Sequence, residues 1–227
     1  DSAPKLTKMA LIQAKIIADW TKIATILTGT YITLALLAPI LMSTSLQQTG
    51  QLLYRIYSAV CHQDPSKSWF FSANSMIPGT TIFNSAEVTF PNTVTPCVEC
   101  SAFLGAPGIG WKTALCHRCT AIYIGVFGAS LIYDQLKSRH IRIPRMPTYL
   151  YLIIGLSPII IDTVLLTDSL NVFTASTLHY SHILSTLTGG FFGATSIWYA
   201  YPQIETHCQT YIYKLSQQRL TQDDTWY

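Results

Sequence analysis

The chain has 227 residues and a formal net charge of +3; only 11% of its residues are charged, while 49% are hydrophobic. Soluble domains usually carry about 25% charged residues. This composition excludes an ordinary soluble domain, and the small positive charge gives no reason to expect a nucleic-acid partner. We therefore expect an integral membrane protein whose first partner is the lipid bilayer.

The first predicted span follows an N-terminal segment, residues 1–22, in which apolar and basic residues are mixed at near-helical spacing. This segment either lies in the membrane interface or extends the span. Residues 23–54 contain no charged side chain, and their core, IATILTGTYITLALLAPILM, is long enough to cross about 30 Å of hydrocarbon. Because no A-x-A site follows this core, a cleaved signal peptide is not expected.

A long segment, residues 45–118, separates the first span from the second. It contains Cys61 and two C-x-x-C pairs, Cys97/Cys100 and Cys116/Cys119. In a soluble protein the spacing of the two pairs predicts a zinc ribbon. Here the second pair leads directly into an apolar stretch, so the cysteines would lie where the chain enters the membrane.

Three further spans are predicted. The second begins at the sequence CHRC and ends near residue 136, with Gly125 and Gly128 spaced for close helix contact. The third, residues 148–167, carries one internal acid, Asp162. The fourth, residues 178–201, contains three glycines and ends in an aromatic belt.

The predicted fold class is therefore all-α: a four-transmembrane-helix bundle over residues 23–201 that includes the Cys-rich loop 45–118. Within lipid only helices and closed barrels satisfy the backbone. Residues 202–227 are expected to form a solvated helical tail. Most of the fourteen Lys and Arg residues lie at the N-terminus, between spans two and three, or after span four. Since basic loops stay inside, we expect both termini in the cytoplasm and the Cys-rich loop to be extracytoplasmic.

The cysteines have three interpretations, because thiols outside the cytoplasm oxidise unless a metal holds them. A C-x-x-C pair supplies two ligands with the spacing that a tetrahedral zinc ion needs. The same residues could form structural disulfides, which would leave Cys61 unpaired, or a redox-active pair. We favour zinc, with His117 in reserve and with the candidate ligands Cys61, His62, Cys97, Cys100, Cys116 and Cys119.

Two stretches, CHQDPSKSWFF from Cys61 and LCHRCTAIYIG from Leu115, resemble a family of small bacterial and archaeal membrane proteins of unknown function. Its members carry a CHQ motif and a C-x-R-C-T-G-I-Y-x-G motif that opens a transmembrane helix. The stretches SPIIIDTVLL and STLTGGFFG are similar to further family patterns. The resemblance implies that the pattern is carried by Cys61, His62, Gln63, Cys116, Arg118, Cys119 and Asp162.

This sequence departs from the family pattern at Ala121, where the family has Gly, and by an insertion at about residues 74–112. The insertion brings in Cys97 and Cys100, which would then form a separate disulfide. The family has no established activity to carry over. The resemblance implies a smaller ligand set: Cys61, Cys116, Cys119 and, as the fourth ligand, His62.

Polar residues within the spans have structural and functional interpretations. A bare carboxylate in lipid costs several kcal/mol, so Asp162 should accept hydrogen bonds from Ser or Thr on a facing helix or pair with Arg118. A proton relay is the alternative role. His179 and His182 are expected at the membrane interface; a haem or chlorophyll ligand is the less favoured alternative for them.

Two functions remain. The first is a non-catalytic accessory or structural subunit of a larger membrane assembly, with protein partners and a zinc- or disulfide-clamped loop. The second is a membrane thiol–disulfide oxidoreductase coupled to a quinone, because a C-x-x-C pair at a helix N-terminus has a stabilised thiolate. No quinone motif is recognisable and the paired cysteines lie in one loop, so we favour the first.

Overall fold

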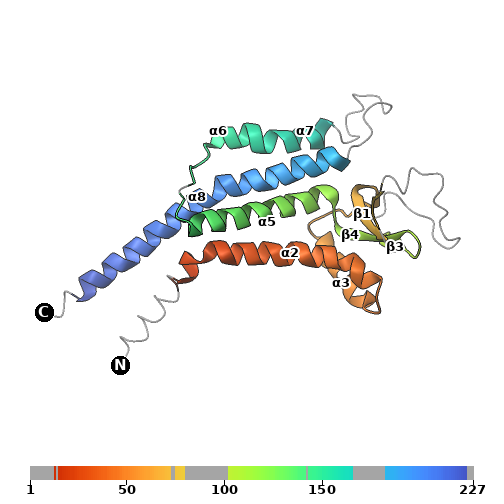
Figure 1. Cartoon of the computed structure of the whole chain (residues 1–227), viewed down its shortest axis with the longest axis horizontal. Helices are drawn as coiled ribbons and strands as arrows, with labels where there is room; N and C mark the ends of the chain where they lie inside the picture. Colours follow the sequence, from red (N-terminus) through yellow and green to blue (C-terminus); the bar gives the residue numbers. More distant parts are fainter. Residues whose placement is uncertain are drawn as a thin grey trace.

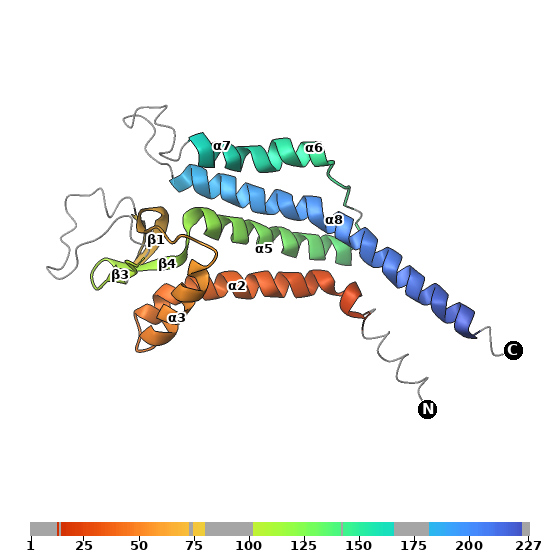
Figure 2. The same ribbon diagram turned by 180° about the vertical axis from the view of Figure 1, so that it is seen from behind.

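The computed structural model describes residues 13, 15–72, 75–79, 102–141, 143–165 and 182–223. Helices lie side by side along most of its length (Figure 1). Seen from behind, they follow one another across the molecule in the order α2, α5, α8 and α7 (Figure 2). Their bounds are α2 (Trp20–Met42), α5 (His117–Ser138), α6 (Thr148–Leu150), the π-helical stretch η2 (Tyr151–Leu156), α7 (Ser157–Leu165) and α8 (His182–Asp223).

Two of the described helices are long and apolar enough to cross a membrane, judged by length and composition: α2 with 23 residues and α5 with 22. At 1.5 Å per residue they are about 34 and 33 Å long, against a hydrocarbon core of ~30 Å. A third apolar helix, Thr148–Val164, is shorter. These helices lie where the first three spans were predicted.

The described helices expose apolar side chains and bury polar ones. On the outer surface, Ile26 of α2 is 66% exposed and Leu187 of α8 is 64% exposed. Between the helices, the hydroxyls of Ser130 on α5 and Tyr201 on α8 are buried and lie 2.8 Å apart. Water-soluble monomers rarely expose large contiguous apolar surface, so this distribution suits a lipid environment.

Helices α5 and α8 approach each other closely because glycines line their contact. A Cβ atom at Gly125 would lie 2.2 Å from the carbonyl oxygen of Gly190, and one at Gly193 would lie 2.2 Å from that of Ile122. Any larger residue would force the two backbones apart. Gly128, which was predicted to serve the same contact, has no neighbour within 4 Å of an added Cβ, and that part of the prediction is wrong.

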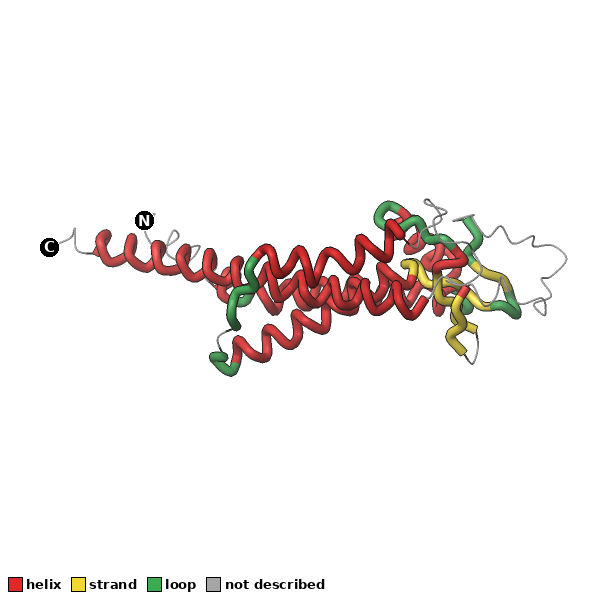
Figure 3. The backbone as a smooth tube through the Cα atoms, turned by 90° about the horizontal axis from the view of Figure 1, so that it is seen from above, coloured by secondary structure: helices red, strands yellow, loops and turns green. Residues whose placement is uncertain are grey.

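Helix α8 is longer than the span predicted for it. It continues through Pro202 to Asp223, so the predicted tail and the fourth span share one helix within the described residues. At 42 residues it is about 63 Å long, and its C-terminal half extends past the other helices (Figure 3).

The segment between α2 and α5, predicted as a Cys-rich loop, contains a helix and a small sheet. The helix is α3 (Gln47–Ser58), and a short 3-10 turn, η1 (Pro65–Lys67), follows it. The sheet is antiparallel with strand order β2-β1-β4-β3, and it lies at one end of the helices (Figure 3). Its strands are β1 (Ser68–Ser72), β2 (Ser75–Pro78), β3 (Gly105–Ala106) and β4 (Gly110–Cys116).

The all-α prediction is therefore wrong for the segment between α2 and α5, and the reason is local. The sequence SWFFS of β1 is rich in aromatic residues, which favour strands. Phe70 from this strand is fully buried and packs with Ala106 and Ile109 in a small core of its own. The larger neighbouring core joins α2 and α3 to the end of β4.

Candidate metal centre

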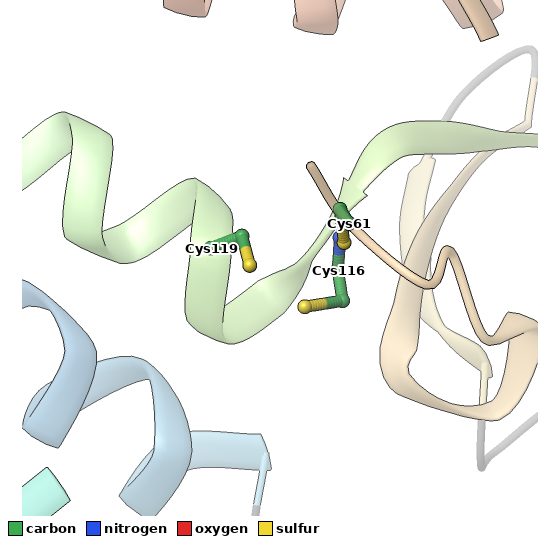
Figure 4. A group of neighbouring side chains, drawn as sticks. All are labelled: Cys61, Cys116 and Cys119. Carbon is green, nitrogen blue, oxygen red and sulfur yellow. The ribbon is translucent and has the colours of Figure 1, made fainter. Parts of the chain in front are cut away.

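Two segments that are far apart in the sequence bring three thiols together at the junction of β4 and α5 (Figure 4). Cys61 follows α3, Cys116 is the last residue of β4, and Cys119 lies in the first turn of α5. Their sulfur atoms all lie within 4.8 Å of one another. All three cysteines are free, as is Cys208 on α8, so none of these residues forms a disulfide.

The local structure explains why the thiols meet. Cys116 and Cys119 are three residues apart at the start of α5, which places them on one side of its first turn. The backbone N–H of Cys116 donates a hydrogen bond to the Cys61 sulfur, with 3.3 Å between the two atoms. Because the N-terminus of a helix carries partial positive charge, this position favours anionic thiolates.

Gln63 and Lys112 hold the Cys61 segment against β4. Gln63 has a left-handed backbone conformation with φ of 52°. The buried side-chain Nε2 of Gln63 donates to the backbone carbonyl oxygen of Tyr54 at 2.8 Å. The backbone carbonyl oxygen of Gln63 accepts from Nζ of Lys112 at 2.7 Å. The Lys112 side chain is fully buried, so the segment after Cys61 is fixed by an interior contact.

The electrostatic surroundings favour a negative charge on Cys61. The thiols of Cys116 and Cys119 donate hydrogen bonds to its sulfur and lower its pKa, and this outweighs the opposing effect of burial. Burial lowers the pKa of Lys112 to about 8, although the nearby Asp64 and Cys61 raise it. Negative charge at Cys61 and Asp64 thus acts against the effect that burial has on Lys112.

The geometry of the three thiols fits a soft metal ion. Tetrahedral zinc with sulfur ligands at about 2.3 Å holds those sulfurs about 3.8 Å apart, within the observed limit. A disulfide would instead place two sulfurs about 2.05 Å apart. The three thiols could supply three of four tetrahedral positions.

The histidines predicted near this site do not join the group of three cysteines. His62 is exposed to solvent, and His117 is buried with its ring 6.0 Å from that of Trp69. Cys97 and Cys100 lie outside the described residues, and so does His179. His182 is the first residue of α8, but its side chain is also outside what the structure describes.

Arg118, between the two cysteines of the CHRC sequence, pairs with Asp162 of α7. Its Nη2 lies 2.6 Å from Oδ2 of Asp162, which is only 2% exposed. The hydroxyl of Ser185 donates to both carboxylate oxygens at 3.1 and 3.0 Å, and that of Thr188 donates to Oδ2 at 3.3 Å. Both structural roles considered for Asp162 occur together, and the pair ties the cysteine-bearing turn to α7 and α8.

Lys112 and Tyr54 are the residues of this site that sequence reasoning missed. Tyr54 donates its hydroxyl to the carbonyl oxygen of Lys112 and so links α3 to β4. The signal that could have found Lys112 is its position in the otherwise uncharged stretch GWKTALC, since a lysine inside a buried strand needs a polar partner.

Comparison with known proteins agrees with a membrane location and names no activity. A family model described as "Predicted membrane protein (DUF2085)" matches residues 108–199, which include Cys116, Arg118, Cys119 and Asp162 but not Cys61. An uncharacterized protein of Methanocaldococcus jannaschii is 28% identical over 110 residues. That match covers 48% of this chain and 46% of the relative, about half the length of each. No solved structure matches the chain.

Proposed function

We propose that the chain is a multi-pass membrane protein in which a metal ion, zinc in the first instance, clamps the Cys61 segment to the start of α5. The single observation that carries this proposal is the convergence of three free thiols, from two segments far apart in the sequence, within 4.8 Å. The membrane location is supported by the two helices of sufficient length and by the similarity to a family of predicted membrane proteins.

Four spans are the arrangement that we propose. The segment from α6 to α7 covers residues 148–165, about 27 Å at 1.5 Å per residue, and packs along α8. Its residue Ile153 is 64% exposed, like the apolar side chains on the outer surface of α8. The excess of basic residues near both chain ends and between α5 and α6 supports cytoplasmic termini and an outer location for the thiols.

The metal would be structural. It would be held by Cys61, Cys116 and Cys119, with the fourth position taken by a water molecule or by a further residue. Bound there, it would neutralise thiolate charge and join the Cys61 segment to the CHRC turn at the end of the helices. Such a clamp prepares a surface for a neighbouring protein, and we therefore propose an accessory or structural subunit of a membrane assembly.

The test is elemental analysis of the purified chain, together with thiol counting by mass spectrometry. We expect close to one equivalent of metal per chain and its loss in the Cys61→Ser and Cys119→Ser variants. Cys208→Ser is the matched control, because Cys208 lies on α8 far along the chain from the cluster and should not change metal content. Metal content that stays the same in all three variants would contradict the proposal.

The same experiment tests thiol–disulfide exchange as the second candidate function. Its support is a C-x-x-C pair at a helix N-terminus with a third free thiol beside it. This function would be favoured over the metal clamp if the purified chain contained no metal and Cys116 and Cys119 formed a disulfide that mild reduction opens.

A further inference from the structure

Helix α3 has three sides, and one of them is apolar but uncovered. Its inner side is buried against the rest of the molecule and consists of Gly50, Tyr54 and Tyr57. At 100° per residue, the exposed remainder divides into two halves. The polar half consists of Gln47, Gln48, Gln51, Arg55 and Ser58. The other half, which is mainly apolar, consists of Leu52, Ile56 and, in the turn that continues the helix, Ala59 and Val60, with one polar residue, Thr49, in the first turn.

The apolar half is a continuous stripe. Leu52, Ile56 and Val60 follow one another at four-residue intervals and are 55%, 55% and 58% exposed. A helix in water would carry polar residues all around its exposed surface. The division of the exposed surface into a polar and an apolar half is instead typical of a helix that lies at a boundary between water and lipid.

The position of α3 relative to α2 places it at such a boundary. A Cβ atom at Gly50 would lie 2.9 Å from Sδ of Met42, the last residue of α2, so the two helices touch at that end. From there α3 runs back along α2: the Tyr57 hydroxyl donates to the carbonyl oxygen of Tyr31 at 2.5 Å, and the two rings are 4.8 Å apart. Helix α3 therefore starts at the end of α2, a helix apolar enough to span a membrane, and lies along the half of α2 between Met42 and Tyr31.

We propose that α3 lies in the membrane–water interface, with Leu52, Ile56 and Val60 among the lipid acyl chains and its glutamines in water. Arg55 lies next to the apolar half, where its long side chain reaches lipid phosphate groups while its stem stays among the chains. This inference rests on the membrane location proposed above and is independent of the metal.

The consequence is that the membrane surface positions Cys61. Tyr57 fixes the C-terminal end of α3 beside Tyr31 of α2. The ring of Tyr31 also contacts that of Tyr123, in the second turn of α5, with ring centroids 4.6 Å apart. Cys61 follows three residues after the end of α3. A helix held at the lipid interface therefore delivers this cysteine to the level of Cys116 and Cys119.

The test is photo-crosslinking of the full chain in vesicles of phosphatidylcholine and phosphatidylglycerol. The amino acid p-benzoyl-phenylalanine, which inserts into C–H bonds, is placed singly at the position of Leu52 or Ile56. The matched controls carry it at Gln51 or Ser58, which are exposed on the polar half of the same helix. A reference variant carries it at Ile26, which is 66% exposed on α2. Intact-mass spectrometry then reports covalent lipid adducts.

We expect lipid adducts at Leu52, Ile56 and Ile26 and at least a tenfold lower yield at Gln51 and Ser58. Equal yields on the two halves of α3, or crosslinks to a second copy or another protein at Leu52, would overturn the interfacial placement while the Ile26 adduct upholds the membrane location. If Ile26 also forms no adduct, the membrane location itself fails.

A second measurement uses the unaltered chain and does not depend on whether a variant folds. Hydroxyl-radical footprinting in the same vesicles should leave Leu52 and Ile56 protected, whereas Met76, which is 45% exposed on β2, should be oxidised. Oxidation of Leu52 and Ile56 to the same extent in vesicles as in the unfolded chain would contradict the proposal.

Discussion

The two ends of the helical region contain polar clusters of opposite character. At the end near the sheet, three thiols meet, and none of them can neutralise another. At the opposite end, the carboxylate of Glu205 on α8 accepts from Nζ of Lys137 at 2.7 Å and from Nε1 of Trp20 at 2.9 Å. In this second cluster, protein groups pair with the charge of the carboxylate: the ammonium group of Lys137 and the indole N–H of Trp20. The thiol cluster has no counter-charge among its own members, and this difference makes it a candidate binding site.

The Arg118–Asp162 pair lies beside the first cluster but resembles the second in its chemistry. The buried carboxylate accepts hydrogen bonds from a guanidinium and two hydroxyls, although the buried Nε of Arg118 has no hydrogen-bond partner among the described residues. This arrangement favours the structural role of Asp162 over a proton relay. Its place next to the cysteines gives it a positioning role for the CHRC turn.

Metal removal should produce the largest change in stability. If it produced none, the contrast between the thiol cluster and the Glu205 cluster would not hold. A ligand that binds only the folded state, present at a thousandfold excess over its dissociation constant, stabilises by about 4 kcal/mol. We expect a chelator to lower the midpoint of thermal unfolding of the wild-type chain in detergent. The chelator should have no effect on the Cys61→Ser variant, and unaltered stability of the wild-type chain after complete metal removal would contradict a structural metal.

Replacement of Arg118 should cause the second-largest loss of stability. Replacing one partner of a buried ion pair leaves the other charge uncompensated, at a cost of about 3 kcal/mol. Arg118→Leu should therefore destabilise the chain strongly, whereas Asp162→Asn keeps the acceptor oxygen for Ser185 and should cost less. Thermal unfolding of both single variants and of the double variant measures the coupling between the two residues. Additive effects in the double variant would show that the pair does not act as a unit.

The sequence predicted part of this molecule well, because some of its signals are local. The CHRC spacing places Cys116 and Cys119 on one helix turn whatever the rest of the chain does. Cys61 entered the site through a family resemblance, since its approach depends on α3 folding back along α2. The polar partners of Asp162 could be expected, because a carboxylate among apolar residues needs them.

Other features could not be predicted because they depend on contacts between distant segments. Lys112 lies 49 residues from Gln63, and the buried hydrogen bond between them exists only after β4 has packed against the segment that follows Cys61. The sheet was missed for a similar reason: β1 pairs with β4 across the long insertion. Helix α8 continues through Pro202, beyond residue 201, where the predicted fourth span ended.

The smallest effect is expected at the opposite end of the helical region and should depend on pH. Burial raises the pKa of Glu205, but hydrogen bonds from Lys137 and Trp20 outweigh it and lower the pKa below the ordinary value of 4.5. Because the folded chain binds the proton less readily than the unfolded chain, the contribution of Glu205 to stability is fully present above pH 4.5 and is lost as the pH falls through the lowered pKa. Glu205→Gln should therefore cost about 1 kcal/mol or less near neutral pH, since the pair is partly exposed, and nothing once the carboxyl is protonated.

The Glu205→Gln substitution should be compared in the Cys61→Ser background, because acid also protonates thiolates and would release a metal bound at the other end. A stability difference between chains with and without the Glu205→Gln substitution that stays constant from about pH 7 to about pH 3 would mean that the carboxylate charge contributes nothing. The cluster would then owe its stability to packing of Trp20 on Tyr201.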